Sequence, residues 1–99
     1  MNSPSLEQMS KVIRGITDAT RAPQPRTNAH RANEAGVLMD AMWVMTGVDP
    51  DPEADGPQTA LTDVLAHLMH YADAHGIDFD ICATGAAGHY RDETEEAGQ

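Results

Sequence analysis

Cysteine, basic side chains and long apolar runs are all scarce in this chain of 99 residues. The single cysteine, Cys82, excludes an intramolecular disulfide and fits a reducing compartment. No stretch approaches the roughly 18 consecutive apolar residues that indicate a membrane-spanning helix. The first residues lack the charged and apolar regions of a signal peptide, so we expect a protein of the cytoplasm. Because 6 basic residues face 16 acidic ones, the formal net charge of −10 disfavours direct binding to nucleic acid or anionic membranes.

Alternation of apolar and polar residues with period two is also missing, and the chain has no internal repeat. The length is typical of one domain, 1–99, that can bury a core without disulfide or metal. Apolar residues recur instead at helical spacing. The sequence therefore predicts an all-α fold, a compact bundle of three to four helices built on an antiparallel pair of the second and third helices.

Start and stop signals divide the chain into helical segments, expected at 4–20, 28–46 and 58–75, with a fourth beginning after Asp78. Ser3-Pro4 is a start signal for the first helix, and Thr27 or Asn28 can cap the second. Gly47 and Gly76 are placed to end the second and third helices in the left-handed conformation. Gly15 either weakens the first helix or lets a neighbouring helix approach closely.

Prolines and acidic residues mark the non-helical parts. The segment 49–57 contains three prolines and four carboxylates, which predicts a flexible acidic loop. Residues 92–99 are expected to form a frayed acidic tail.

The negative charge is concentrated in the second half of the chain. Residues 1–48 hold five basic and four acidic residues, a net of +1, whereas residues 49–99 hold twelve acidic residues and Arg91, a net of −11. A solvated surface that aids solubility is one interpretation. The other is a negative face that binds a basic protein in place of nucleic acid. Its candidate partner-binding residues are Asp49, Asp51, Glu53, Asp55, Asp73, Asp78 and Asp80.

The predicted second helix is apolar nearly all round, which is typical of a helix buried in a bundle or by a partner. Its methionines could form an adaptable contact surface, although packing in a core is the more common explanation for such residues. The alternative function is therefore a structural or regulatory module that forms homo-oligomers, such as a homodimer, through Val37, Met39, Met42, Val44 and Met45.

The predicted third helix places Asp63, His67 and His70 on one polar face. Two imidazoles and a carboxylate are suitable ligands for zinc or a redox metal, so a metal-binding enzyme or sensor is a further alternative. Such trios also arise on ordinary polar helix faces, and we expect neither a bound metal nor a cofactor. Cys82 is expected to be a buried, inert thiol. Since no complete catalytic motif is present, we expect no enzymatic activity.

Basic residues gather around the first helix and the segment that follows it: Lys11, Arg14, Arg21, Arg26 and Arg31. Without interleaved aromatic residues, they are a poor nucleic-acid site. We expect them to form salt bridges with the acidic second half.

The run Thr59 to Asp73, the Gly76-Ile77-Asp78-Phe79-Asp80 turn and the pair His89-Tyr90 resemble a segment of small acidic proteins from bacteriophages and other mobile elements of high-GC bacteria. The resemblance covers residues 59–90 and implies a helical hairpin and a mobile-element origin, so the cytoplasm that we expect is that of a bacterial host. Gly85 and Gly88 depart from the alanine- and arginine-rich second helix of those proteins.

Small acidic proteins of such elements include many inhibitors of host defence, and anti-CRISPR proteins are the prominent group. By this analogy, the first functional hypothesis is a non-enzymatic interaction protein that inhibits a host nucleic-acid-handling complex as an acidic nucleic-acid mimic. Its partner would be a host protein with a basic, nucleic-acid-binding surface.

Overall fold

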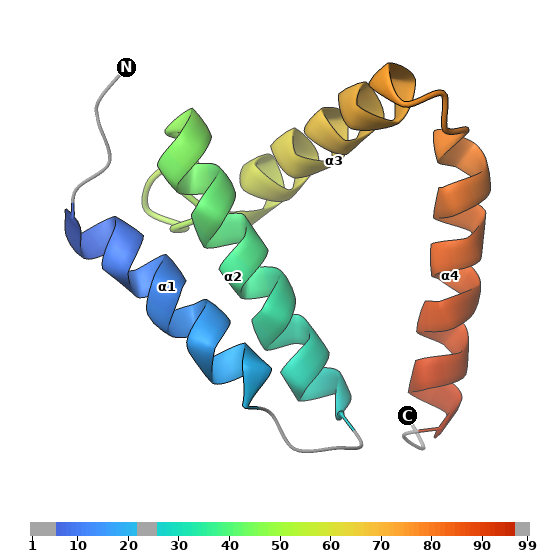
Figure 1. Cartoon of the computed structure of the whole chain (residues 1–99), viewed down its shortest axis with the longest axis horizontal. Helices are drawn as coiled ribbons and strands as arrows, with labels where there is room; N and C mark the ends of the chain where they lie inside the picture. Colours follow the sequence, from blue (N-terminus) through green and yellow to red (C-terminus); the bar gives the residue numbers. More distant parts are fainter. Residues whose placement is uncertain (1–5, 22–25, 97–99) are drawn as a thin grey trace. The chain divides into compact units, whose positions relative to one another are not determined.

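The computed structural model describes residues 6–21 and 26–96, and these ranges contain four α-helices and no β-strand (Figure 1). The all-α prediction is thereby confirmed. The helices are α1 (Leu6–Thr20), α2 (Asn28–Thr46), α3 (Pro57–Ala74) and α4 (Phe79–Glu96). The Ser3-Pro4 start signal lies outside the described residues.

The chain divides within α3 into two units, one ending at Val64 and the other beginning at Leu65. The first unit contains α1, α2 and the first turns of α3. The second contains the rest of α3 and all of α4.

In the first unit, α1 and α2 lie side by side and run antiparallel (Figure 1). Within the described residues this is the closely packed helix pair, in place of the expected pair of helices 2 and 3. The physical reason lies at Gly15. A Cβ atom built there would be 2.8 Å from Cγ2 of Val37, so the missing side chain is what lets the two helices approach. The structure therefore shows the second of the two roles predicted for Gly15, the close approach of a neighbouring helix.

The ends of α2 follow the predicted capping signals. The Thr27 hydroxyl accepts a hydrogen bond from the backbone N–H of His30, and the N–H of Thr27 donates to Nδ1 of His30, which completes a capping box. At the other end, Gly47 adopts φ 81°, and its N–H donates to the Trp43 carbonyl over 2.8 Å. The bounds predicted from the sequence, 28–46, are those of the structure.

The acidic segment after α2 forms a loop closed on itself. The N–H of Gly56 donates to the carbonyl of Asp49 over 3.1 Å, and Gly56 adopts φ 94°. Pro57 follows at the first position of α3, where its missing N–H leaves no helical hydrogen bond unmade. The predicted loop is confirmed, while its flexibility stays a prediction.

In the second unit, α3 and α4 are joined by a corner that local hydrogen bonds define. Gly76 adopts φ 65°, and the N–H of Ile77 donates to the Ala72 carbonyl over 2.9 Å, as in a Schellman motif. Asp78 then caps α4 by accepting from the N–H of Ile81 over 3.2 Å.

The helix α4 is longer than the sequence predicted, because residues 92–96 continue it as far as Glu96. The frayed tail expected at 92–99 is therefore wrong for these residues, and residues 97–99 lie outside the described part. Glutamate is a good helix former, which favours this extension. The Thr94 hydroxyl also donates to the carbonyls of Tyr90 and Arg91.

Few side chains are buried. Among the described residues, the buried apolar ones are Ala60 and Val64 in the first unit and Ala72 in the second. The helices α1, α2 and α4 contain no buried residue among those described. No helix in the described ranges is long and apolar enough to cross a membrane.

Candidate protein-interaction surface

An apolar groove runs along one side of the α1–α2 pair. It consists of two depressions that meet at Ala41, one reaching Ile16 and Leu38 and the other reaching Ile13 and Met45. We call this surface the α1–α2 face and define it by six side chains, three from each helix: Met9, Ile13, Ile16, Leu38, Ala41 and Met45. All six belong to the first unit.

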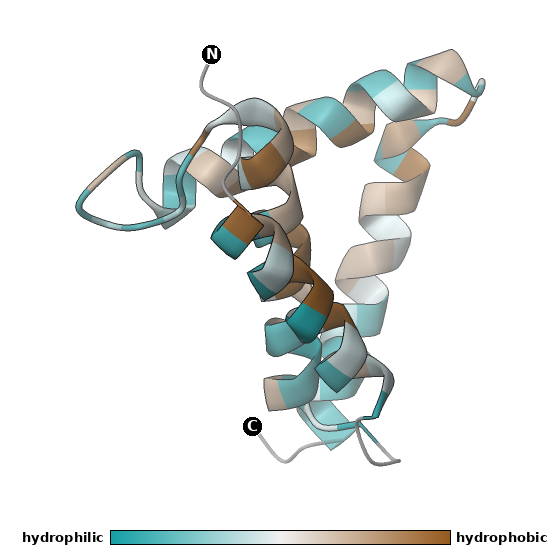
Figure 2. Cartoon of the chain, turned by 60° about the vertical axis from the view of Figure 1, so that its left-hand side comes forward, coloured by the Kyte–Doolittle hydropathy of each residue, from teal (hydrophilic) through white to brown (hydrophobic). Residues whose placement is uncertain are grey.

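The large side chains of the α1–α2 face are open to solvent. The exposed fractions are 64% for Ile13, 51% for Ile16 and 62% for Met45. Figure 2 shows hydrophobic positions along both helices of this pair. An apolar surface that follows two helices for their common length is a typical feature of protein–protein contacts.

Charged groups beside this pair are matched within the first half of the chain. The ammonium of Lys11 lies 3.7 Å from a carboxylate oxygen of Asp40, which joins α1 to α2. Arg26 pairs with Glu34, and both residues line one end of the groove. These two ion pairs use carboxylates of the first half, so the prediction of salt bridges to the acidic second half is wrong for Lys11 and Arg26.

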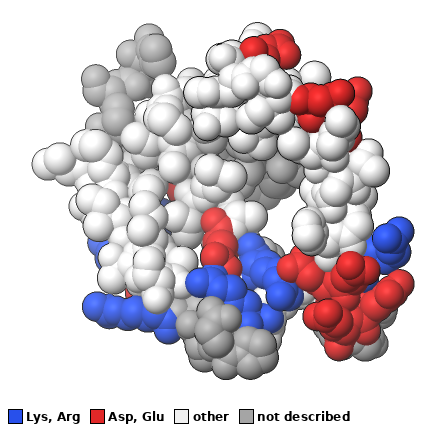
Figure 3. All heavy atoms as spheres, turned by 45° about the vertical axis from the view of Figure 1, so that its right-hand side comes forward, with Lys and Arg blue, Asp and Glu red and all other residues white. Residues whose placement is uncertain are grey.

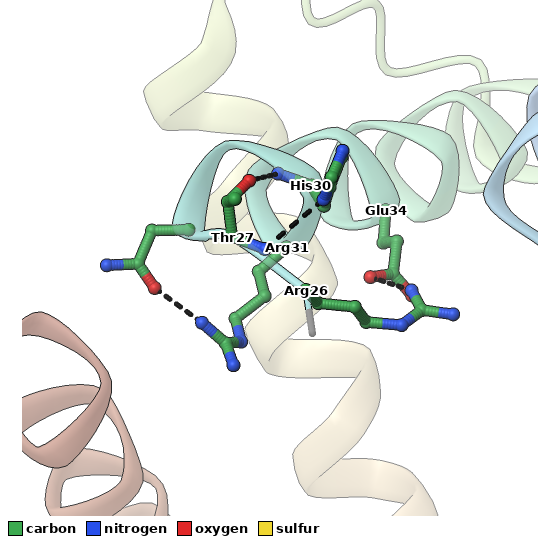
Figure 4. A network of polar contacts seen from close by, with 6 residues as sticks. Arg26, Thr27, His30, Arg31 and Glu34 are labelled. Atoms are coloured by element: carbon green, nitrogen blue, oxygen red, sulfur yellow. Dashed lines mark hydrogen bonds and ion pairs between the residues drawn. The ribbon is translucent and has the colours of Figure 1, made fainter. Parts of the chain in front are cut away.

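Figure 4 shows the Arg26–Glu34 ion pair next to the capping box at the start of α2. Arg31 in the first turn of α2 donates to the side-chain oxygen of Asn28 over 2.7 Å, beside the Thr27–His30 cap. The start of α2 is therefore held by polar contacts close in sequence, which keep the edge of the groove in place.

The predicted oligomer residues have different environments. Val37 is half-buried and packs against Gly15 in the contact between α1 and α2, and it also lines the depression that reaches Ile16 and Leu38. Val44 and Met45 line the groove, whereas the half-buried Met39 and Met42 do not.

Ile13 and Ile16 in α1 were missed as surface residues, as was Leu38 in α2. Their signal in the sequence is the helical periodicity of Leu6, Met9, Ile13 and Ile16 in α1, which predicts an apolar face. Periodicity does not tell whether the face is covered by the same chain or left open.

The predicted acidic site is divided between local structural roles. Asp49 accepts from the N–H of Asp51, and Asp51 in turn accepts from that of Glu53. Asp55 accepts from the N–H of Asp49 over 3.0 Å, and Asp78 caps α4. Asp51, Glu53 and Asp55, with Asp73, Asp78 and Asp80, are exposed, and Asp49 is half-buried. The first four of the seven residues belong to the first unit and the last three to the second.

Carboxylates also gather at the C-terminal end of α4, where Figure 3 shows a cluster of acidic side chains. This part of the helix contains Asp92, Glu93, Glu95 and Glu96, which belong to the predicted acidic tail.

The candidates for metal and thiol chemistry lie on α3 and α4. Asp63 is half-buried, while His67 and His70 are exposed. In the described part of the chain, no group of three or more His, Cys, Asp or Glu side chains could hold a metal ion. Cys82 is exposed, so the expected buried thiol is wrong. Ile81, which precedes Cys82 in α4, is exposed as well.

Comparisons with models of protein families, with curated proteins and with solved structures give no match for this chain.

Proposed function

We propose that this chain is a non-enzymatic interaction protein that binds another protein surface through the α1–α2 face. The observation that supports it is the open apolar groove between α1 and α2, in which Ile13 is 64% exposed. Parallel or crossed packing of helices into such a groove is a common way for helical proteins to associate.

The size of the hydrophobic effect indicates what kind of partner this face needs. Complete burial of a Leu, Ile or Met side chain stabilises by about 1.5–3 kcal/mol. Four side chains of the face are about half exposed, namely Ile13, Ile16, Leu38 and Met45. Burying their exposed parts would therefore contribute on the order of 3–6 kcal/mol to binding. Association itself costs roughly 4–15 kcal/mol in lost motion. The partner must therefore bring a comparable apolar surface of its own.

Site-specific photo-crosslinking tests the proposal. A photoreactive phenylalanine analogue replaces Ile13 on the α1–α2 face and, in a matched control, the exposed Ile81 on α4. In cells that produce the chain, we expect a discrete cross-linked protein band from position 13 and none of similar yield from position 81. Equal, diffuse labelling at the two positions would contradict a specific interaction surface.

A second candidate function rests on the acidic residues. Glu53, Asp73 and Asp80 are exposed, and four more carboxylates occupy the end of α4 (Figure 3). Together with the resemblance of residues 59–90 to proteins of mobile elements, this charge supports binding to a basic surface of a host nucleic-acid-handling protein. In that role the chain would be an acidic inhibitor of the anti-CRISPR kind.

Salt dependence tests this second function. If surface charge steers the complex, the affinity for a basic partner should fall steeply between about 50 and 500 mM NaCl, where the Debye length shrinks well below 10 Å. Replacing Asp73 and Asp80 with asparagine should weaken binding, and Thr62→Asn is the neutral control. Affinity that is unchanged at high salt would exclude an electrostatic mimic.

A further inference from the structure

We infer that the α1–α2 face is covered by a second copy of this chain, so that two α1–α2 hairpins form a four-helix bundle. This inference rests on the proposed function and names the partner. An antiparallel helix pair has one open side, and packing two such pairs face to face is the simplest closed helical bundle.

Charge favours a second copy at this face. The described parts of α1, α2 and the segment joining them carry five basic and four acidic residues, a net of +1, whereas residues 49–99 carry a net of −11. Two copies that met through acidic surfaces would repel each other. The α1–α2 pair belongs to the near-neutral half, and its ion pairs Lys11–Asp40 and Arg26–Glu34 are already internal. The six side chains that define the face carry no charge, so self-association through them places no like charges in direct contact.

The shape of the α1–α2 face is also suited to contact with the same face of a second copy. Ala41, a small residue, lies where the two depressions meet, and the exposed Ile13, Ile16 and Leu38 stand beside it. In a two-fold symmetric contact, the same patch supplies both the projections and the depressions that receive them. A large side chain of one copy can then fill the space over Ala41 of the other.

The length of α1 sets the area that the face can offer to a second copy. With 15 residues at 1.5 Å each, α1 is about 22 Å long, and two adjacent helices are about 20 Å wide. Because side chains corrugate a helical surface, its accessible area exceeds this projected rectangle. The projected rectangle is about 440 Å², and the roughly 800 Å² per partner that a standard interface buries is accessible area.

Association with a second copy would also bury apolar side chains that the single chain leaves exposed. Neither α1 nor α2 has a buried residue within its bounds, although both helices carry large apolar side chains. Helices gain most of their stability in proteins from packing an apolar face. The second copy would supply this packing, so the stability of the hairpin should depend on protein concentration.

Sedimentation equilibrium on the full chain tests the inference. We expect the wild type to have twice its 10.6 kDa mass at micromolar concentration. Ile13→Glu places a carboxylate in the apolar contact and should raise the dimer dissociation constant at least about 100-fold. Ile81→Glu introduces the same group at an exposed position of α4 and should leave the dissociation constant unchanged. A wild type that is monomeric throughout, or a dimer broken by Ile81→Glu and not by Ile13→Glu, overturns the inference.

A second measurement covers the case in which Ile13→Glu does not fold. In a mixture of isotope-labelled and unlabelled wild-type chains, NMR should detect contacts between copies at the methyl groups of Ile13, Ile16 and Leu38. The melting temperature of the wild type should also rise with protein concentration. Contacts between copies confined to α4 would contradict the inference.

The two proposals can fail separately. If position 13 cross-links to a different protein and the chain is monomeric, the second copy is excluded while the interaction function stands. If position 13 cross-links to nothing, both are excluded.

Discussion

In the α1–α2 hairpin, the contacts that define the structure join residues far apart in the chain, whereas at the α3–α4 corner they join near neighbours. Gly15 meets Val37, and Lys11 meets Asp40, across the two helices of the hairpin. At the corner, the N–H of Ile77 reaches back only to the carbonyl of Ala72, and Asp78 caps its own helix at Ile81.

The two regions are therefore held in their conformations by different kinds of contact. The corner is specified by glycine conformation and by a capping carboxylate, both of which work without tertiary packing. The hairpin needs a missing Cβ atom on one helix and a matching side chain on the other. Changes in the hairpin should therefore affect the stability of the whole first unit, while changes at the corner should act on the ends of α3 and α4 that meet there.

The largest effect is expected at the Gly15–Val37 contact. Gly15→Val would place side-chain atoms where Cγ2 of Val37 is already 2.8 Å from an added Cβ. Overpacking of this kind typically lowers the free energy of unfolding by about 1–3 kcal/mol, and we expect the upper part of that range. Urea denaturation at a fixed protein concentration measures it.

Gly36→Val is the matched control, because nothing lies within 4 Å of a Cβ atom added at Gly36. It should change stability by less than about 0.5 kcal/mol. Combining Val37→Ala with Gly15→Val should recover part of the loss. Equal losses from the two glycine substitutions would show that the hairpin is not packed at Gly15.

The next effect in size concerns the corner. Asp78→Ala removes the side chain that accepts from the N–H of Ile81, which should destabilise α4 by about 1 kcal/mol. Hydrogen exchange should show faster exchange in the first turns of α4 and unchanged exchange in α2. Asp78→Asn keeps an accepting oxygen and should retain most of the protection. Faster exchange throughout α2 would contradict the local origin of the corner.

A gain of stability is expected inside α4. Gly85 lies in the helix, and an added Cβ atom there would meet nothing within 4 Å. Gly85→Ala should therefore stabilise the helix by about 0.5–1 kcal/mol, because alanine loses less backbone freedom on folding. Gly76→Ala is the opposite test, since Gly76 adopts φ 65° and alanine is strained there. Circular dichroism melts of the two variants should shift in opposite directions.

The same contrast explains which features the sequence predicts. Thr27, Gly47, Gly76 and Asp78 act on backbone groups within a few residues, so α2 and the corner follow from the sequence alone. The continuation of α4 through residues 92–96 was missed because a run of acidic residues is compatible with either a helix or a tail.

The pairing of helices and the candidate surface were harder to predict. Periodicity shows that Ile13 and Leu38 belong to apolar faces, but it does not distinguish a covered face from an open one. The α1–α2 pair depends on Gly15, for which the sequence left both a weakened helix and a close approach open. The acidic residues were predicted as a binding site, yet Asp49, Asp51 and Asp55 accept hydrogen bonds from the backbone of their own loop.

The smallest effect is expected from the ion pair that joins α1 to α2. The side chain of Lys11 is 59% exposed and its nitrogen is 3.7 Å from the Asp40 carboxylate, so water and salt screen the attraction. A double-mutant cycle with Lys11→Gln and Asp40→Asn should give a coupling of about 0.2–0.5 kcal/mol that vanishes near 1 M NaCl. A coupling above about 1 kcal/mol would contradict this screening and show that charge contributes substantially to the pairing of α1 with α2. A small coupling leaves close packing as what pairs α1 with α2, while the α3–α4 corner needs no such contact.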